Sequence, residues 1–246
     1  QTVMRTSMEL GGNAPFIVCD DADIDRAVDG VMIAKMRNMG QACTAANRIF
    51  VHRSVIDEFT DKLVARMSAL QIGNGADDGV AAGPLVERKA VDKVERLVRD
   101  AITKGATVRC GGPEASDVPS SGHFYPPTVL TGITPDADLM TTESFGPVAA
   151  ITAFDGTGTE ADDAVLAMAN DTPWGLVGYV FSRDVDRLDR LSSRLEVGMV
   201  GNNTGLVSNP AAPFGGVKES GLGREGGRIG IEEFLDVKYV TRPIIR

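Results

Sequence analysis

The sequence has little cysteine and little histidine: three cysteines (Cys19, Cys43 and Cys110) and two histidines (His52 and His123) among 246 residues. An odd number of widely spaced cysteines excludes a disulfide framework and a zinc-binding pattern, and it is typical of the reducing cytoplasm. Two histidines also exclude a metal site built from several imidazoles. We therefore expect a cytoplasmic protein without a metal centre.

Long apolar runs and an excess of basic charge are also missing. No apolar stretch approaches the roughly 20 residues that cross a bilayer. The 34 acidic residues outnumber the 25 basic ones, which gives a formal net charge of −9. Such a balance carries no signature of binding to nucleic acid or to an anionic membrane. With 43% hydrophobic and 24% charged residues, the chain has the composition of a globular protein with a packed core.

Short apolar runs alternate along the chain with longer segments of helical periodicity. The apolar runs predict buried strands at residues 16–18, 49–51, 148–154, 178–181 and 197–200. Apolar residues at helical spacing predict helices at residues 24–32, 55–67, 91–102, 160–170 and 184–195. This alternation predicts an α/β fold with a doubly wound, mostly parallel sheet covered by helices on both faces.

Local signals mark several ends of these elements. The acidic run Asp20–Asp23 favours a helix start, and Ser54 with Asp57 three residues later predicts a capping box. Residues 111–123 are rich in Gly, Pro and Ser and predict a surface loop. Residues 234–240 alternate enough to predict a lone strand that pairs outside the main sheet, for instance with another subunit.

Cys43 lies in a polar, glycine-containing break, residues 38–44, between a predicted helix and a predicted strand. A nucleophile needs an exposed position of this kind, whereas a structural cysteine usually lies inside an apolar run. The context alone leaves open whether Cys43 is a nucleophile or a small buried hydrophobe. A cysteine–histidine pair has no local support, because His52 ends a strand and His123 lies in the loop.

Two carboxylates stand next to glycine-containing turns. Glu9 precedes Gly11-Gly12, and Glu143 precedes Phe145-Gly146-Pro147. Taken singly, each is more typical of a solvated surface residue than of a site. The glycine-rich segment 214–225 contains no phosphate-binding P-loop, and no strand precedes its Gly-Leu-Gly as a dinucleotide-binding turn requires.

Taken in order, these motifs resemble the NAD(P)-dependent aldehyde dehydrogenases. Glu9-Leu10-Gly11-Gly12 comes first, Gly40-Gln41-Ala42-Cys43 ends 34 residues after Glu9, and Glu143-Ser144-Phe145-Gly146-Pro147 begins 100 residues after Cys43. Pro213-Phe214-Gly215-Gly216 and Gly221–Glu225 complete the set. The match runs from about Arg5 to Val240, and segment 203–226 most resembles the succinate-semialdehyde dehydrogenases.

The resemblance implies chemical roles for five residues. Cys43 would be the nucleophile and Glu9 the base that activates a hydrolytic water. Glu143 would hold the nicotinamide ribose of NAD or NADP, with Phe145 and Leu10 at the nicotinamide end. An aldehyde would be oxidised to an acid through a cysteine thiohemiacetal and thioester.

The resemblance also implies a substrate site for succinate semialdehyde. Arg37 and Ser208 stand where the succinate-semialdehyde enzymes bind the substrate carboxylate, and Phe214 would line the substrate tunnel. From the residues alone, Arg37 is more typical of an arginine that faces solvent at a helix end, and Ser208 could be a turn residue. Ala45 stands where some of these enzymes have a second cysteine, so no disulfide switch is expected.

Members of this family are about twice as long, so the resemblance implies a C-terminal half. Residues 1–20 would be the last segment of the cofactor-binding domain, 21–230 the catalytic domain, and 231–246 an oligomerisation strand and tail. We expect a homo-oligomer, dimer or tetramer, and no turnover by these 246 residues alone. The alternatives are a dehydrogenase for glutarate semialdehyde or another aldehyde, a CoA-acylating enzyme, or a non-catalytic piece retained for assembly.

Overall fold

The structure is a computed structural model that describes residues 3–116 and 118–244. Its central sheet contains β2 (Ala14–Val18), β3 (Ala46–His52), β4 (Thr107–Cys110), β5 (Thr128–Thr131), β6 (Val148–Phe154), β8 (Val177–Phe181) and β9 (Met199–Asn202). The helices are α1 (Ile24–Met36), α2 (Ile56–Ser68), α3 (Arg88–Thr103), α4 (Gly158–Asn170) and α5 (Val185–Arg194). Two short antiparallel pairs join β1 (Met8–Glu9) to β11 (Gly221–Leu222) and β7 (Trp174–Gly175) to β10 (Val217–Lys218).

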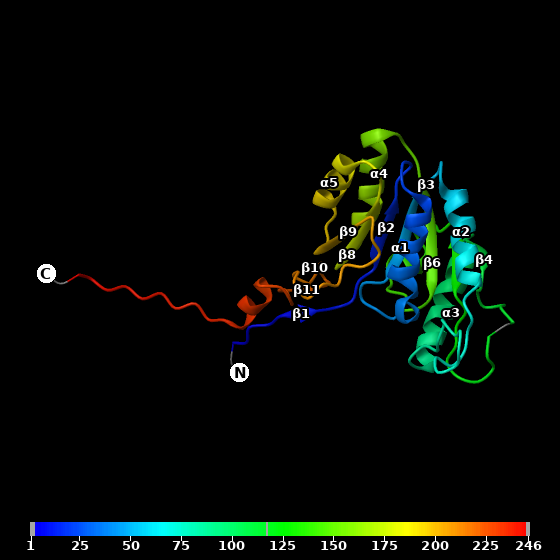
Figure 1. The fold of residues 1–246 in the computed structure, drawn as a ribbon, viewed down its shortest axis with the longest axis horizontal. Coiled ribbons are helices and arrows are strands. Elements are labelled where there is room, and N and C mark those ends of the chain that lie inside the picture. Colours follow the sequence, from blue (N-terminus) through cyan, green and yellow to red (C-terminus); the bar gives the residue numbers. More distant parts are fainter. Residues whose placement is uncertain (1–2, 117, 245–246) are drawn as a thin grey trace.

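The seven strands lie in the order β4-β5-β6-β3-β2-β8-β9 (Figure 1). Every neighbouring pair is parallel except β4 and β5, which are antiparallel at one edge. The α/β fold with a mostly parallel sheet, predicted from the sequence, is therefore confirmed. The strand β5 was missed, because its four residues lie between Pro126-Pro127 and Gly132 and give too short a pattern.

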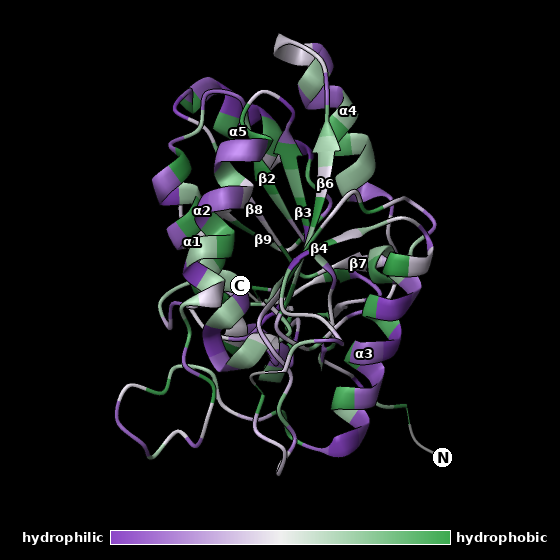
Figure 2. Cartoon of the chain, turned by 90° about the vertical axis from the view of Figure 1, so that its right-hand side faces the viewer, coloured by the Kyte–Doolittle hydropathy of each residue, from purple (hydrophilic) through white to green (hydrophobic). Residues whose placement is uncertain are grey.

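Helices cover both faces of the sheet, as the doubly wound arrangement requires. In β2, Phe16 and Val18 belong to the apolar cluster under α1, α2 and α3, whereas Ile17 belongs to the cluster under α4 and α5. Side chains of a strand alternate between faces, so a strand buried on both sides must be apolar at every position. Figure 2 shows this apolar colouring along the central strands, between helices with hydrophilic outer faces.

Two helix starts follow the acidic signals in the sequence, and one does not. Asp23 caps α1 by accepting a hydrogen bond from the Arg26 amide, and Asp184 caps α5 in the same way. The capping box predicted at Ser54 is wrong. The helix α2 begins at Ile56 without a side-chain cap, because the Ser54 hydroxyl pairs with Nδ1 of His52 at 2.8 Å instead.

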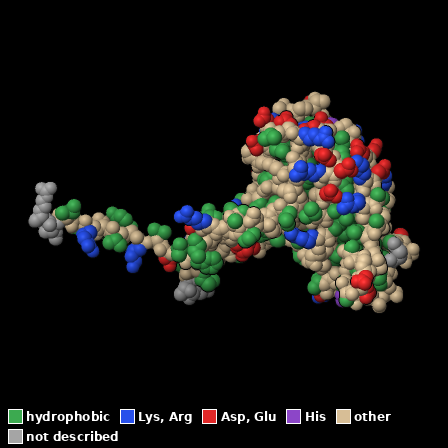
Figure 3. Space-filling model, viewed as in Figure 1, with side chains coloured by type: hydrophobic (Ala, Val, Ile, Leu, Met, Phe, Trp, Pro, Cys, Tyr) green, Lys and Arg blue, Asp and Glu red, His purple; other side chains and the backbone are tan. Residues whose placement is uncertain are grey.

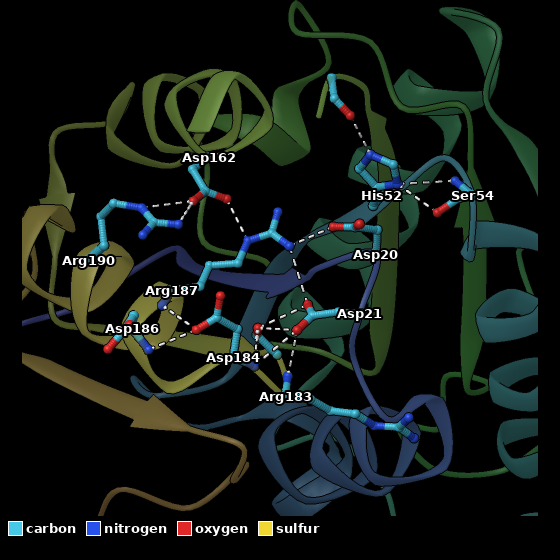
Figure 4. A network of polar contacts seen from close by, with 12 residues as sticks. Asp20, Asp21, His52, Ser54, Asp162, Arg183, Asp184, Asp186, Arg187 and Arg190 are labelled. Atoms are coloured by element: carbon cyan, nitrogen blue, oxygen red, sulfur yellow. Dashed lines mark hydrogen bonds and ion pairs between the residues drawn. The ribbon is translucent and has the colours of Figure 1, made fainter. Parts of the chain in front are cut away.

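The helices α4 and α5 are tied to the end of β2 by a buried arginine (Figure 4). Nε of Arg187 donates to Asp162 at 2.6 Å, and its Nη1 donates to Asp20 and Asp21. The side chains of Arg187 and Asp162 are 7% and 0% exposed. Arg190 also pairs with Asp162, so one buried carboxylate accepts hydrogen bonds from two guanidinium groups.

The strand β2 has a bearing on the predicted domain division. It lies near the middle of the sheet, between β3 and β8, so a boundary at residue 20 would separate a central strand from its neighbours. A boundary before Ala14 fits this sheet, and residues 14–18 form part of the same packed unit as the strands that follow. The assignment of the preceding residues to a cofactor-binding domain stays a prediction.

The strand predicted at residues 234–240 is not formed in the single chain. Residues Ile229–Phe234 make a 3₁₀ turn, and no regular element follows as far as residue 244. The segment projects away from the body of the molecule (Figure 1). A strand needs a neighbouring strand to satisfy its amides and carbonyls, and among the described residues this segment has none. Its pairing with another subunit stays a prediction.

Within residues 3–116 and 118–244, no helix combines the length and apolar character that crossing a membrane demands. The same residues contain no cluster of three or more His, Cys, Asp or Glu side chains suited to a metal ion.

Candidate active site

Cys43 lies in a tight turn between α1 and β3. The turn begins with the 3₁₀ segment Arg37–Gly40, in which Asn38 and Met39 have φ values of 50° and 55°. Left-handed backbone is uncommon for residues other than glycine. Gly40 is also left-handed, and a Cβ there would collide with the carbonyl oxygen of Gly146. The strained turn is therefore packed directly against the turn that follows Glu143, and only glycine permits that approach.

The turn that carries Glu143 meets Gly11 and Gly12 as well. Oε1 of Glu143 accepts a hydrogen bond from the amide of Gly12 at 3.2 Å. A Cβ on Gly11 would lie 2.8 Å from Oε2, and a Cβ on Gly12 would lie 3.1 Å from the carbonyl oxygen of Cys43. The paired glycines therefore let two motifs, 131 residues apart in the chain, close around the cysteine.

The half-buried thiol of Cys43 has a raised pKa. Burial is the main cause, and the negative charge of Glu143 adds to it, with a smaller addition from Glu9. The backbone amides of Cys43 and Thr44 oppose these effects by donating toward the sulfur. Backbone amides beside a nucleophile are groups that can stabilise an oxyanion formed when a thiolate attacks a carbonyl.

Glu9 lies in β1, opposite Gly221 of β11. Neither of its carboxylate oxygens has a hydrogen-bond partner within the described residues, although both are buried. Burial and the charge of Glu225 raise its pKa, and Arg224 partly offsets them. A Cβ on Gly215 would lie 2.7 Å from Oε1 of Glu9, so the carboxylate packs against that glycine. A carboxylate with a raised pKa and no fixed proton donor is suited to act as a general base.

Arg37 is exposed just after α1 and lies six residues before Cys43. Its Nη2 donates to the Thr44 hydroxyl at 3.5 Å, and its charge acts on the buried phenol of Tyr179, as does Cys43. Tyr179 donates to the carbonyl oxygen of Thr44 at 2.8 Å. Arg37, the predicted cation, and Cys43, the predicted nucleophile, thus both lie close enough to Tyr179 to affect the pKa of its phenol.

Among the described residues, no hydrogen bond joins Ser208 or Phe214 to Cys43, Glu9 or Glu143. Ser208 is exposed and lines a cavity of about 490 Å³ with Met199 and Val207, and among the described residues no hydrogen bond joins it to Arg37. Its loop does pack on α1, since a Cβ on Gly205 would collide with the carbonyl oxygen of Gly30. Phe214 is half-buried and pairs through its backbone with Glu225.

The two residues predicted at the nicotinamide end differ in their surroundings. Phe145 is half-buried with φ of 50°, and the ammonium of Lys93 lies 5.8 Å from the centre of its ring. Leu10 is exposed, and its amide donates to the carbonyl oxygen of Ser220. Leu10 follows Glu9 by one residue and Phe145 follows Glu143 by two, and the roles of both stay predictions.

Sequence reasoning missed the polar side chains that support the site. Lys35 is fully buried and contacts Asn47 and Ser144, and Tyr179 is buried in β8. A signal for Lys35 was present, because it continues the apolar stripe through Val28 and Val31 and so had to face the core. Tyr179 gave no such signal, since an aromatic residue in an apolar strand looks like any core residue.

Comparison with known proteins identifies the family. The aldehyde dehydrogenase family model matches residues 1–240. The chain is 51% identical to a glutarate-semialdehyde dehydrogenase of Pseudomonas aeruginosa over 98% of its own length and 48% of that protein. It is 49% identical to a succinate-semialdehyde dehydrogenase [NADP(+)] of Escherichia coli over 97% of its length and 48% of that protein.

A solved structure gives the same result. The crystal structure of an aldehyde dehydrogenase from Brucella melitensis biovar abortus superposes with a TM-score of 0.89 at 52% identity, covering 96% of this chain and 47% of that one. The chain thus spans about half the length of the relatives it matches. It belongs to the aldehyde dehydrogenase family.

Proposed function

We propose that this chain carries the catalytic centre of an NAD(P)-dependent dehydrogenase that oxidises succinate semialdehyde to succinate. The observation that supports this most strongly is the surroundings of Cys43. Its thiol faces two backbone amides and lies close enough to Glu143 and Glu9 for both charges to affect its pKa. This set of groups serves acyl chemistry on a sulfur nucleophile.

The residues around Glu143 fit a nicotinamide cofactor. One carboxylate oxygen is held by the Gly12 amide, and the other borders the space left by the missing side chain of Gly11. Glu143 could therefore accept hydrogen bonds from ribose hydroxyls, with Phe145 beside it. A bound NAD(P) would supply the acceptor for the hydride that leaves the substrate carbon.

The first covalent step needs the Cys43 thiolate. Its sulfur attacks the aldehyde carbon, the C–S bond forms, and the carbonyl π electrons move to oxygen to give a thiohemiacetal. The amides of Cys43 and Thr44 donate to the developing oxyanion, which stabilises the transition state without reorganisation. Loss of hydride then leaves a thioester on the same sulfur.

The second step is hydrolysis of that thioester. Glu9 takes a proton from water as the water oxygen attacks the carbonyl carbon, and the C–S bond breaks to release the acid and regenerate the thiolate. The raised pKa of Glu9 brings its basicity closer to neutral pH, which favours proton transfer. Retention of this carboxylate favours hydrolysis over transfer to CoA.

Arg37 is the residue that supports an aldehyde with a distal carboxylate. It is a cation close to Thr44, the neighbour of the nucleophile, and a guanidinium binds a carboxylate through charge-assisted hydrogen bonds. Ser208 would add a hydroxyl to this carboxylate site. The two relatives named above act, by their names, on succinate and glutarate semialdehydes, so the one-carbon-longer glutarate semialdehyde is the second candidate substrate.

The substrate assignment is tested with Arg37→Leu in the protein encoded by the open reading frame in which these 246 residues lie. Loss of a charge-assisted contact worth about 1.5–3 kcal/mol should raise KM for succinate semialdehyde roughly 10- to 100-fold. KM for a neutral aldehyde of similar length should hardly change. Equal effects on both aldehydes would contradict a carboxylate-binding role for Arg37.

The alternative of a non-catalytic assembly piece is tested on the thiols. Iodoacetamide should label the half-buried Cys43 well before the buried Cys19, as read by mass spectrometry of peptides. Equally slow labelling of all three would favour a structural role for Cys43.

A further inference from the structure

Lys35 is a buried cation without a carboxylate partner among the described residues. It lies in the last turn of α1 with its side chain completely inaccessible to solvent. Removing a charge from water costs several kcal/mol unless it is paired or well hydrogen-bonded. An apolar residue would fill this position in an ordinary helix, so the amine needs a specific explanation.

The amine of Lys35 joins the segments on either side of the candidate site. It donates to Oδ1 of Asn47 at 2.6 Å, to the carbonyl oxygen of Gly146 at 3.0 Å and to the hydroxyl of Ser144 at 3.3 Å. Asn47 lies four residues after Cys43, whereas Ser144 and Gly146 flank Phe145. Ser144 also donates to Asn47 at 3.0 Å, so these groups form one closed network.

This network lies where the two strained turns touch. The carbonyl oxygen of Gly146, which accepts from Lys35, is the atom that a side chain on Gly40 would strike. Met39 and Phe145, one in each turn, both have left-handed backbone. Such conformations persist only where the surrounding contacts hold them, and the Lys35 amine supplies contacts to both sides.

We propose that Lys35 is a positioning residue that fixes the Glu143 turn against the Cys43 turn and so sets the affinity of the enzyme for its nicotinamide cofactor. This inference rests on the proposed function, in which Glu143 binds the ribose. Lys35 is buried away from the substrate and the cofactor, and it acts through Ser144 and Gly146 on Glu143, which precedes Ser144, and on Phe145, which lies between them.

The charged groups around Lys35 should make the affinity for the cofactor depend on pH. Burial lowers the pKa of Lys35 to about 7, the charge of Glu143 opposes this shift, and the charge of Lys93 adds to it. The Lys35 cation in turn helps to keep the pKa of Glu143 from rising further. As pH rises through 7, Lys35 loses its charge, which should weaken its contacts to Asn47, Ser144 and Gly146. The KM for the cofactor should therefore increase.

The test uses Lys35→Met, which keeps the length of the side chain and removes the amine, in the protein encoded by the complete reading frame. KM for NAD(P) should rise at least 10-fold, while KM for the aldehyde stays within about 2-fold. The increase in cofactor KM near pH 7 should disappear. A merely structural role would not separate the two KM values or remove a step from the pH profile.

Two further variants cover the case in which Lys35→Met does not fold. Asn47→Asp places a carboxylate on the amine, which raises the pKa of Lys35 and should move the step in cofactor KM to higher pH. Ser144→Ala removes one of the three contacts and should give a smaller, 2- to 5-fold increase in cofactor KM. Leu63→Ala, a buried change in α2 away from the network, should lower the urea midpoint and leave both KM values unchanged.

The outcomes separate this inference from the proposed function. Turnover by the wild-type protein, with cofactor KM and its pH profile unaltered in the Lys35, Asn47 and Ser144 variants, would overturn the role of Lys35 alone. Absence of NAD(P)-dependent aldehyde oxidation in the wild-type protein would overturn the proposed function, and the role of Lys35 in it would fall too.

Discussion

At the scale of single residues, the candidate site gathers groups that oppose one another's ionisation. Cys43, Glu143 and Glu9 all have raised pKa values, with burial the first cause in each. The two carboxylates make the thiolate less favourable. The thiol therefore depends on the nearby amides, and on any cation that enters the site, to become an anion at neutral pH.

We expect Glu143→Gln to make Cys43 more acidic. The charge of Glu143 is the second cause of the raised pKa of Cys43, and the amide keeps the shape of the side chain. Without that charge, the thiolate should form at lower pH, so the iodoacetamide labelling rate should reach half its maximum at lower pH. The rate is measured by mass spectrometry of the Cys43 peptide between pH 6 and 10.

Two controls accompany this measurement. Cys110, labelled in the same samples, should keep its profile. Glu95→Gln, on the outer side of α3 where Glu95 pairs with Arg99, makes the same chemical change away from the thiol and should leave Cys43 unaltered. An unchanged Cys43 profile in Glu143→Gln would show that the two side chains do not interact.

The candidate catalytic residues could be named from sequence motifs, whereas the residues that support them could not. Cys43, Glu9 and Glu143 stand in motifs whose glycines mark close approaches, and the structure shows why those glycines are needed. Lys35 lies inside a helix and has no motif around it. Its contacts join residues 35, 47, 144 and 146, which only the tertiary fold brings together.

At the scale of elements, the sequence predicted the strands and helices of the parallel sheet because each is buried and therefore strongly patterned. Prediction from the sequence failed where a side chain binds a partner that the local pattern does not indicate, and where the apolar pattern is short. Ser54 binds His52 rather than capping α2, and β5 has only four residues. The strand predicted at 197–200 begins two residues later, at Met199.

The pair of helices α4 and α5 offers a matched test of buried against exposed ion pairs. Asp162 and Asp163 are neighbours in α4, and both bind arginines of α5. Asp162→Ala leaves the buried Arg187 short of a partner and should lower the free energy of unfolding by about 3–5 kcal/mol. Urea denaturation followed by circular dichroism measures the loss.

Asp163→Ala is the control, since its pair with Arg194 is half-exposed or more on both sides. The same change of residue type in the same helix should then cost less than about 1 kcal/mol. Similar losses in both variants would show that the buried network does not stabilise the sheet–helix interface more than a surface pair does.

At the scale of the whole molecule, the most unusual feature is the apolar segment near the C-terminus. Phe234, Val237 and Tyr239 are 82%, 99% and 85% exposed, and Figure 3 shows apolar side chains along the projecting arm. Exposing these apolar side chains to water does not stabilise a single chain, whereas burying them at an interface would. The alternation in the sequence predicts a strand, but the structure of the single chain forms none there, because a pattern cannot supply the neighbour that a strand needs.

We expect this segment to pair with a second copy of the chain. Val237 and Tyr239 lie two residues apart and would share one face of a strand. Val237→Asp combined with Tyr239→Asp should therefore turn an oligomer into a monomer, because burying two carboxylates at the interface is unfavourable. Size-exclusion chromatography with light scattering, over a range of concentrations, gives the mass.

Lys238 provides the control for charge, because it lies between these two residues and would face the other way. Lys238→Glu changes the net charge by −2, as the double variant does, and should leave the oligomer intact. The double variant should also keep the circular dichroism spectrum of the wild type, since neither side chain packs within its own chain. A wild-type chain that is monomeric at every concentration, or equal dissociation of both variants, would show that this segment is not the interface.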